Sequence, residues 1–338
     1  MKKLLVLFLA LVASSASVFA KGGGDAAGGL PTIGVAIYRF DDTFMSATRN
    51  AIQQNAANVA TLRVVDSQNT QPTQNDQVDQ FIAQKVRSMA INPVDRTAAG
   101  TIVDKAKAAN IPIVFFNREP EKADMAKWEK VYYVGAKAED SGTYQGQIIA
   151  DYWKAHPEAD RNGDGVLQYI MLKGQAGHQD AELRTEYSIK AVTAAGIKVE
   201  KLAEDIANWQ VSEATDKMSA YIANFGDRIE AVFCNNDDMA LGAIQALKNA
   251  GYFGADGKYV PVVGVDATAP GLQALAEGTL LGTVLNDAAN QGKATFELAY
   301  ALAAGKDVRA TSWTITDGKY VWVPYQKVTK ENYKQFQN

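Results

Sequence analysis

Short apolar runs alternate with helix-like segments from Pro31 almost to the end of the chain. The apolar runs lie at residues 32–38, 62–65, 88–92, 111–117 and 131–135, and again at 166–172, 198–203, 229–235, 260–265 and 281–286. The segments between them repeat with helical spacing, as where Met45, Thr48 and Ile52 share one face. Strand, helix and strand in close succession form the repeating unit of a parallel sheet. The sequence therefore predicts an α/β protein with doubly wound parallel sheets.

The alternation restarts after residue 135, so it forms two sequential sets of about five strands each. No linker rich in Pro or Ser separates the sets, and 338 residues is a suitable length for two domains. We therefore expect two lobes of similar size. Residues 313–328 look like two extended runs around Asp317 and Gly318, which are a typical turn pair.

The N-terminus has the pattern of a secretory signal peptide. Lys2 and Lys3 form its charged region, residues 4–12 its apolar region, and a small-x-small site ends at Ala20. The apolar run is too short to span a bilayer comfortably, and no cysteine follows it to carry a lipid anchor. We expect residues 1–20 to be removed, residues 21–30 to form a flexible leader, and the mature chain to lie in the periplasm.

Charge and cysteine content exclude several classes of protein. The net charge is −4 and no basic run is present, which argues against nucleic acid or an anionic membrane surface as a partner. The single cysteine, Cys234, excludes an intramolecular disulfide and a cysteine-based zinc or iron–sulfur site. Cys234 lies in an apolar run, so we expect a buried core thiol.

Polar and aromatic residues follow the predicted strands at the points where these strands end, which is where ligands bind in open α/β sheets. A single Asp or Asn at such a point can simply cap the next helix, and a single ring can belong to the core. Seven such strand ends in one chain favour a shared site for a polyhydroxy ligand. The residues are Asp41, Asp42, Phe44, Asn117, Arg118, His178, Asp180, Arg184, Trp209, Asn235, Asn236, Asp237, Asp238, Asp266, Asn286 and Asp287.

Residues 177–184 (GHQDAELR) hold the densest group of such side chains. Asp180 and Arg184 are four residues apart and share a face if this segment is helical. With His178 they supply acceptors, a planar donor fork and an imidazole, a combination suited to a neutral polyol. The alternative is a surface ion pair beside a loop histidine.

Eight short motifs together resemble the periplasmic D-galactose/D-glucose-binding proteins over about residues 32–325. The motifs are YRFDDTFM (38–45), DSQN (66–69), VFFNREP (114–120), LKG (172–174), GHQDA (177–181), NND (235–237), VGVDA (263–267) and GTVLND (282–287). No single motif is specific, but the combination is.

This resemblance implies a fold, a ligand and partners. The fold would be that of a type I periplasmic binding protein, with lobes 31–135 plus 287–321 and 136–286 plus 322–338. Three crossings would form the hinge, near Gly135, Asn286 and Val321. The lobes would close over one monosaccharide, D-glucose or D-galactose, and the monomer would deliver it to an ABC transporter permease and possibly to a chemotaxis receptor.

The resemblance also implies which residues contact the sugar. Hydrogen bonds would come from Asp42, Asn117, His178, Asp180, Arg184, Asn236, Asp266 and Asn286. Phe44 and Trp209 would stack on the two apolar faces of the sugar ring.

Residues 160–168 (DRNGDGVLQ) fit the calcium-loop pattern, with oxygen ligands at Asp160, Asn162, Asp164, Val166 (backbone carbonyl) and Gln168. Position 12 of the pattern is Met171 rather than a bidentate Glu, and a strand follows instead of a helix, so a remote carboxylate is needed. The resemblance places it at Glu230. We expect a structural calcium ion; the alternative is a solvated polar turn.

Two other classes of protein could use the same residues. Asp42, Asp180 and Asp266 could act as paired carboxylates in a secreted carbohydrate-active enzyme, although no tuned acid, phosphate loop or Ser-His pattern accompanies them. A sugar-responsive regulator would need a DNA-binding segment where this chain has a signal peptide. Within the same fold, ribose or inositol could replace the hexose. We therefore expect a binding protein and no enzyme.

Overall fold

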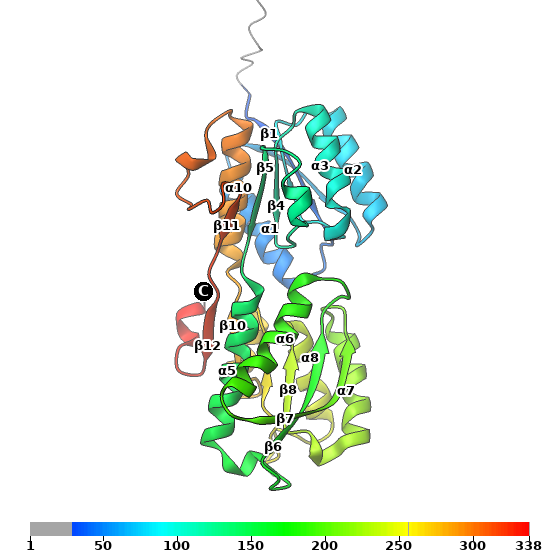
Figure 1. Cartoon of the computed structure of the whole chain (residues 1–338), viewed down its shortest axis with the longest axis vertical. Helices are drawn as coiled ribbons and strands as arrows, with labels where there is room; N and C mark the ends of the chain where they lie inside the picture. The colour runs from blue at the N-terminus through cyan, green and yellow to red at the C-terminus, as the bar shows by residue number, and fades with distance from the viewer. Residues whose placement is uncertain (1–28, 256, 338) are drawn as a thin grey trace, which may run out of the picture.

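The computed structural model describes residues 29–255 and 257–337, and these form two lobes stacked along the long axis of the molecule (Figure 1). Each lobe is a twisted sheet with helices on both faces, which confirms the predicted α/β fold. The predicted signal peptide and residues 21–28 of the leader lie outside the described residues. Between residues 29 and 337, position 256 excepted, no helix is both long enough and apolar enough to span a membrane.

The first lobe is built on a six-stranded, fully parallel sheet with the order β11-β5-β4-β3-β1-β2. Its central strands β3 and β4 are buried at every position, which explains their continuous apolar sequence. The strands are β1 (Thr32–Ile37), β2 (Thr61–Asp66), β3 (Ser88–Ile91), β4 (Ile113–Phe116), β5 (Val131–Gly135) and β11 (Tyr320–Trp322). The helices are α1 (Thr43–Ala56), α2 (Gln71–Ala83), α3 (Ala99–Ala109), α4 (Lys122–Met125) and α10 (Ala288–Ala303).

The second lobe has the strand order β12-β10-β9-β8-β6-β7. Its strands are β6 (Val166–Lys173), β7 (Lys198–Ile206), β8 (Ala231–Cys234), β9 (Val262–Val263), β10 (Gly282–Leu285) and β12 (Gln326–Thr329). Its helices are α5 (Ala138–Ala155), α6 (Gln179–Ala194), α7 (Val211–Phe225), α8 (Asp237–Asn249) and α9 (Ala269–Glu277). The sheet is parallel, as predicted, except at one edge, where β12 runs antiparallel to β10. β12 enters directly from the other lobe, with no crossover helix to reverse its direction.

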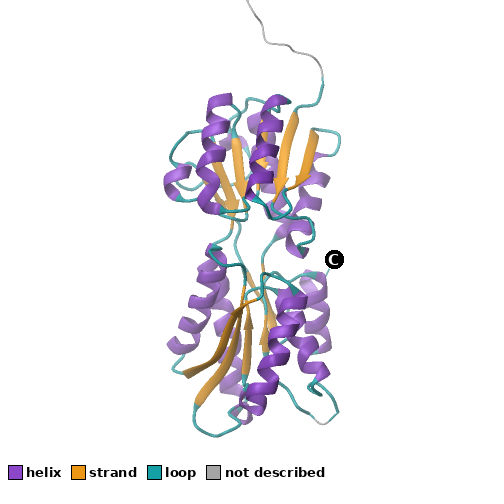
Figure 2. Ribbon diagram, turned by 90° about the vertical axis from the view of Figure 1, so that its right-hand side faces the viewer, coloured by secondary structure: helices purple, strands orange, loops and turns teal. Residues whose placement is uncertain are grey.

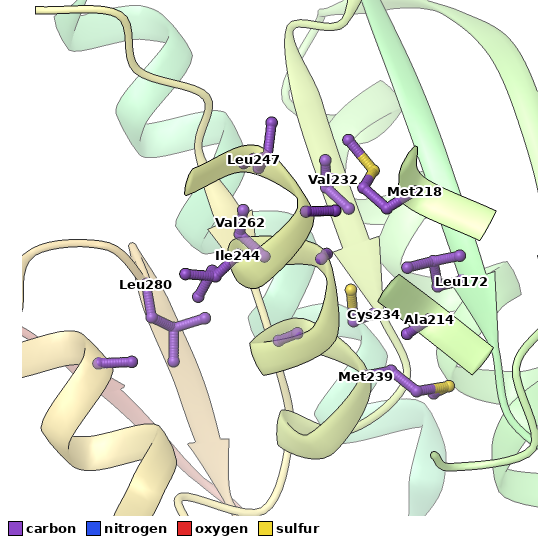
Figure 3. Close-up of a cluster of buried hydrophobic side chains, with 14 of the residues drawn as sticks. Leu172, Ala214, Met218, Val232, Cys234, Met239, Ile244, Leu247, Val262 and Leu280 are labelled. Carbon is purple, nitrogen blue, oxygen red and sulfur yellow. The ribbon is translucent and has the colours of Figure 1, made fainter. Parts of the chain in front are cut away.

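The core of the second lobe packs α7, α8 and α9 against one face of its sheet. Figure 3 shows part of this cluster, with Val232 and Cys234 of β8 among side chains such as Met218 and Ile244. Cys234 is fully buried, as the sequence predicted, and burial raises the pKa of its thiol well above the ordinary value. This thiol is a packing group.

The chain passes between the lobes three times, after β5, after β10 and after β11 (Figure 2). The linking residues are 136–137, 286–287 and 323–325. The turn predicted at Asp317 and Gly318 is present, and both residues have positive φ. The extended runs around it do not form a long hairpin, because only Thr316 and Tyr320 pair and the second run divides between the two sheets. The residue limits predicted for the lobes stay a prediction.

Candidate ligand-binding site

All ten residues predicted to contact a ligand line one cavity between the lobes. Its empty volume is about 340 Å³, including the space at its mouth. The first lobe contributes side chains that follow β1 and β4, and the second contributes side chains that follow β6 to β10. The ten are Asp42, Phe44, Asn117, His178, Asp180, Arg184, Trp209, Asn236, Asp266 and Asn286, and Tyr38, Met45 and Arg118 complete the lining.

Three cavity residues are also helix caps. Asp42 Oδ1 accepts from Met45 N at 2.8 Å at the start of α1, and Asn236 Oδ1 accepts from Met239 N at 3.0 Å at the start of α8. His178 Nδ1 accepts from Asp180 N at 3.1 Å at the start of α6. Capping and lining the cavity are therefore not alternatives, because each cap fixes one atom and leaves others available to a ligand.

The cap also defines the protonation of His178. Since Nδ1 accepts a hydrogen bond, the neutral ring carries its proton on Nε2 and can donate it. Burial lowers the pKa of His178 well below its ordinary value, and the charges of Arg118 and Arg184 act in the same direction. His178 is thus a neutral donor at physiological pH.

Asp180 and Arg184 form the central ion pair of the site. Both are buried, and Arg184 Nη2 lies 3.3 Å from Asp180 Oδ2. Arg184 Nη1 donates to Asn235 O at 2.8 Å, whereas its Nε is buried without a partner within the described residues. Burial raises the pKa of Asp180, and Arg184 opposes this rise. The surface ion pair considered above is therefore wrong for these residues.

A chain of amides holds Asp266, another buried carboxylate of the site. Asn286 Nδ2 donates to Asp266 Oδ1 at 3.1 Å, and Gln291 Nε2 donates to Asn286 Oδ1 at 2.5 Å. Burial raises the pKa of Asp266 well above its ordinary value, against the effect of Arg184. The cavity lining thus offers a hydroxyl-bearing ligand both hydrogen-bond donors and hydrogen-bond acceptors.

Two aromatic rings, Phe44 and Trp209, lie in the cavity wall from opposite lobes, and both are largely buried. Trp209 has φ +66° and follows Asn208 with φ +48°, so two adjacent residues adopt the left-handed conformation. Its ring packs onto Gly174, where a Cβ atom would lie 2.1 Å from the indole. Asn117 and Asp266 also have positive φ, at +61° and +119°. Such strain concentrates where side-chain direction matters for function.

Three further residues line the cavity: Tyr38, Met45 and Arg118. None was among the ten predicted ligand contacts, although Arg118 was among the strand-end residues. Tyr38 donates to Asp42 Oδ2 at 2.5 Å, and the Arg118 guanidinium lies 3.8 Å from the centre of the Tyr38 ring. Arg118 is 4% exposed, and its Nε has no partner within the described part of the chain. Tyr38 comes directly after β1 and Arg118 is the second residue after β4, so the strand-end rule, which selected Arg118, could also have selected Tyr38.

The strand-end rule also selected residues that serve the fold. Asp237 is fully buried and accepts from Thr283 Oγ1 at 2.6 Å and from Thr268 N at 2.8 Å, which ties α8 to neighbouring strand ends. Asn235 Oδ1 accepts from Gly174 N at 3.0 Å. Asp287 caps α10, and Asp41 forms an exposed ion pair with Arg39. None of these four lines the cavity.

Direct hydrogen bonds join the lobes at the mouth of the cavity. Thr43 Oγ1 donates to Asp238 Oδ2 at 2.8 Å on one side. On the other side, Arg118 Nη2 donates to Gln175 Oε1 at 3.0 Å and Gln179 Nε2 donates to Glu119 Oε2 at 3.2 Å. The lobes therefore stand in a closed arrangement.

The predicted calcium loop lies at the opposite end of the second lobe, before β6 (Figure 1). Asp160 accepts from the backbone of Gly163, Asp164 and Gly165, and Asp164 Oδ1 accepts from Val166 N. Asn162 Nδ2 donates to Asp164 Oδ2. As predicted from the motif, a strand follows this loop.

Glu230 lies against this loop. Its two oxygens accept from Arg161 N and Gln168 N, each at 2.9 Å. Burial raises the pKa of Glu230, and the charges of Asp160 and Asp164 raise it further. Gln168 Oε1 is buried without a partner among the described residues.

These donors fit a hard cation, because all are oxygens and a cation would neutralise the three carboxylates. No group of three or more His, Cys, Asp or Glu side chains that could hold a metal is found within residues 29–255 and 257–337. The loop oxygens are bonded to the loop's own amides instead. The calcium site stays a prediction.

Comparisons with known proteins agree on one family. A model of the periplasmic binding protein domain matches residues 33–307. The chain is 45% identical over 308 residues to the D-galactose/methyl-galactoside binding periplasmic protein of Haemophilus influenzae, covering 90% of this chain and 91% of that protein. It is 34% identical to a putative rhizopine-binding protein of Rhizobium meliloti, covering 90% and 92% of the two chains.

A solved structure has the same architecture. It is an ABC transporter solute binding protein from Bacillus halodurans with bound myo-inositol, 32% identical to this chain, with a TM-score of 0.77. The match covers 93% of this chain and 99% of that one.

Proposed function

This chain belongs to the periplasmic binding protein family, and from this premise we propose that it binds one D-galactose or D-glucose molecule in the interlobe cavity. Binding takes place in the periplasm, and the closed complex presents the sugar to the permease of an ABC transporter. The observation that carries this proposal is the convergence of eight hydrogen-bonding side chains and two rings from both lobes on one cavity.

The site chemistry suits an uncharged hexose. The charges of Asp180 and Arg184 are paired with each other, so the cavity offers directed hydrogen bonds without a large net charge. Phe44 and Trp209 supply two apolar surfaces for the faces of a pyranose ring. A ligand that contacts both lobes favours the closed form by its differential affinity for that form.

Calorimetric titration with galactose, glucose, ribose and myo-inositol tests the proposal. We expect one-to-one binding of a hexose, with ribose and myo-inositol at least 100-fold weaker. Inositol is the competing ligand, because the structure from Bacillus halodurans holds myo-inositol and is 32% identical to this chain. Tight inositol binding without hexose binding would reassign the ligand and keep the fold-based mechanism.

Binding without chemistry is the second part of the proposal. The two curated relatives described above are named for binding. We expect the bound sugar to be recovered unchanged, and we expect no hydrolysis of galactosides or glucosides in a long incubation. Release of the aglycone would establish a carbohydrate-active enzyme instead.

We also propose a structural calcium ion in the 160–168 loop, held by Asp160, Asn162, Asp164, Val166, Gln168 and Glu230. The support is the all-oxygen donor set and the unpaired Gln168 Oε1. The ion would contribute stability and take no part in sugar binding.

The remaining proposals concern the mature protein and its partners. We propose that the signal peptide is cleaved after Ala20, that the protein works as a monomer, and that the closed form also engages a chemotaxis receptor. Mass spectrometry of the secreted protein tests the cleavage site, and light scattering tests the monomer.

A further inference from the structure

Two buried tyrosines, one just before the first crossing segment and one in the third, have hydroxyls that bond to cavity-lining residues. Tyr133 lies in β5, just before the first crossing, and its hydroxyl donates to Asn117 O at 2.8 Å. Tyr325 lies in the third crossing, and its hydroxyl accepts from Arg184 Nη2 at 2.9 Å. Neither tyrosine lines the cavity.

Each of these hydroxyls helps to fix the conformation of a cavity-lining residue, the backbone of Asn117 or the side chain of Arg184. Asn117 has φ +61°, and its backbone is fixed by Asn117 N donating to Val134 O at 3.0 Å and by its carbonyl accepting from Tyr133. Arg184 is 3% exposed, and its orientation depends on Asp180, Asn235 and Tyr325. Loss of either hydroxyl would remove one of the restraints that orient a cavity residue.

The two tyrosines also connect to the hinge itself. Tyr133 packs edge-on against Tyr320 and Trp322 of β11, at centroid distances of 6.0 and 5.5 Å. Gly135 ends β5, and an added Cβ there would lie 2.0 Å from the Tyr133 hydroxyl. Tyr325 is only three residues beyond β11 and is buried in the core of the second lobe. Both hydroxyls therefore lie at or next to the segments about which the lobes would rotate.

We propose that Tyr133 and Tyr325 are positioning residues that couple sugar contact to the hinge, Tyr133 through Asn117 in the first lobe and Tyr325 through Arg184 in the second. Each hydroxyl bond joins a residue at or next to a crossing segment to a ligand-contacting residue, so the sugar has its full set of bonds only when the crossings have their closed geometry. This inference rests on the proposed function of the cavity.

The variants Tyr133→Phe and Tyr325→Phe remove one oxygen each and keep the ring packing. We expect each to weaken sugar binding about tenfold, the scale of one buried hydrogen bond. The loss should appear mainly as faster dissociation in stopped-flow tryptophan fluorescence, because the hydroxyls stabilise the closed complex rather than the encounter. The melting temperature without sugar should stay within a few degrees of wild type.

Tyr320→Phe is the matched control. Tyr320 lies on the crossing strand β11 and packs on the same rings, but its hydroxyl makes no hydrogen bond within the described residues. This variant should bind sugar as wild type does. If Tyr133→Phe and Tyr325→Phe also bind as wild type, or lose thermal stability while keeping the wild-type dissociation rate, the tyrosines are structural only and the inference is overturned.

Titration of the wild-type protein distinguishes a failure of the proposed function from a failure of the proposed coupling. If wild type binds none of the four sugars tested, the proposed function fails and the coupling fails with it. If wild type binds one of them, that sugar serves for the variants, and unchanged variants overturn the coupling alone.

Discussion

The interlobe cavity and the 160–168 loop both gather carboxylates and amides, yet they use them in opposite ways. In the cavity the polar groups come from distant parts of both lobes and are buried, and the Nε atoms of Arg118 and Arg184 have no partner within the described chain. In the loop the polar groups come from consecutive residues, and Asp160 and Asp164 already accept from neighbouring amides.

This difference shows why the two regions depend on the fold to different degrees. A loop whose side chains satisfy its own backbone can form largely from local sequence, with few distant partners, among them Glu230, Tyr259 and Asp227. The cavity exists only when two sheets direct their strand ends at each other. Perturbing the cavity should therefore alter ligand affinity, whereas perturbing the loop should alter stability alone.

The largest effect is expected from Asp180→Asn. The change keeps the shape of the side chain but leaves Arg184 buried without its carboxylate partner. We expect the dissociation constant for the sugar to rise by about 100-fold or more, as for other buried charge pairs that lose one partner. Calorimetry measures this. Asp41→Asn, at an exposed ion pair beside the cavity residue Asp42, is the control and should change affinity less than twofold. Wild-type affinity in Asp180→Asn would remove Asp180 from the site.

The next effect is the pH dependence of stability that comes from Asp237, the buried carboxylate that follows Asn236. Burial raises the pKa of Asp237 to about 7, partly opposed by hydrogen bonds from Thr283 and Thr268. The folded protein therefore holds this proton between about pH 4 and 7 while the unfolded chain does not. The stability contributed by Asp237 is present below pH 4 and is lost as the pH rises through 7.

Asp237→Asn tests this pH dependence. The variant should show a smaller fall in melting temperature between pH 5 and pH 8 than wild type, with a difference of the order of a few kcal/mol in the free energy of unfolding. In the loop, the pKa of Asp164 is lowered instead: burial acts to raise it, but the hydrogen bonds from Val166, Asn162 and Gln168 outweigh that effect. Asp164→Asn should therefore show the same fall in melting temperature between pH 5 and pH 8 as wild type. Equal pH profiles for wild type and Asp237→Asn would contradict the assignment.

A smaller effect is expected from removing calcium. A ligand at 100 times its dissociation constant stabilises a protein by about 2.7 kcal/mol, so a chelator should lower the melting temperature by several degrees. Glu230→Gln removes one charge from the loop, and we expect it to abolish most of the chelator effect. Hexose affinity should be the same with and without chelator. A melting temperature that does not respond to chelator at low calcium would refute a metal in this loop.

The sequence predicted the fold well because the βα alternation depends on local periodicity. Of the twelve strands in the described part of the chain, ten were placed within a few residues of their observed bounds. Local periodicity could not show that the final extended run divides between two sheets, since β11 and β12 are short and their partners lie far away in sequence. Only the family resemblance implied a crossing near Val321.

The strand-end rule identified the neighbourhood of the cavity but could not tell which way each side chain points. Asn236 and Asp237 are adjacent, yet one lines the cavity and the other binds Thr283 and Thr268 behind it. Arg118 was seen at a strand end and left out, although it lines the cavity beside Asn117. Tyr325 had no such signal, because its role depends on a contact with Arg184 across 141 residues.

The smallest effects are expected from alanine substitution of two glycines, one in the loop and one at the cavity, which compares the two regions directly. Gly163 in the loop and Gly177 at the mouth of the cavity have φ +72° and +75°, and neither has an atom within 4 Å of an added Cβ. Alanine at either position therefore has the same backbone cost, roughly 1–2 kcal/mol, without a clash. Both variants should lose a similar amount of thermal stability.

Only Gly177→Ala should also weaken sugar binding, by a few-fold, because it shifts the segment that holds His178 and Gln179 at the mouth. Gly163→Ala should bind sugar as wild type does. Calorimetry and thermal melting on the same samples measure both quantities. A loss of affinity in Gly163→Ala would mean that the loop is coupled to the cavity through β6, which begins at the loop and ends five residues before His178.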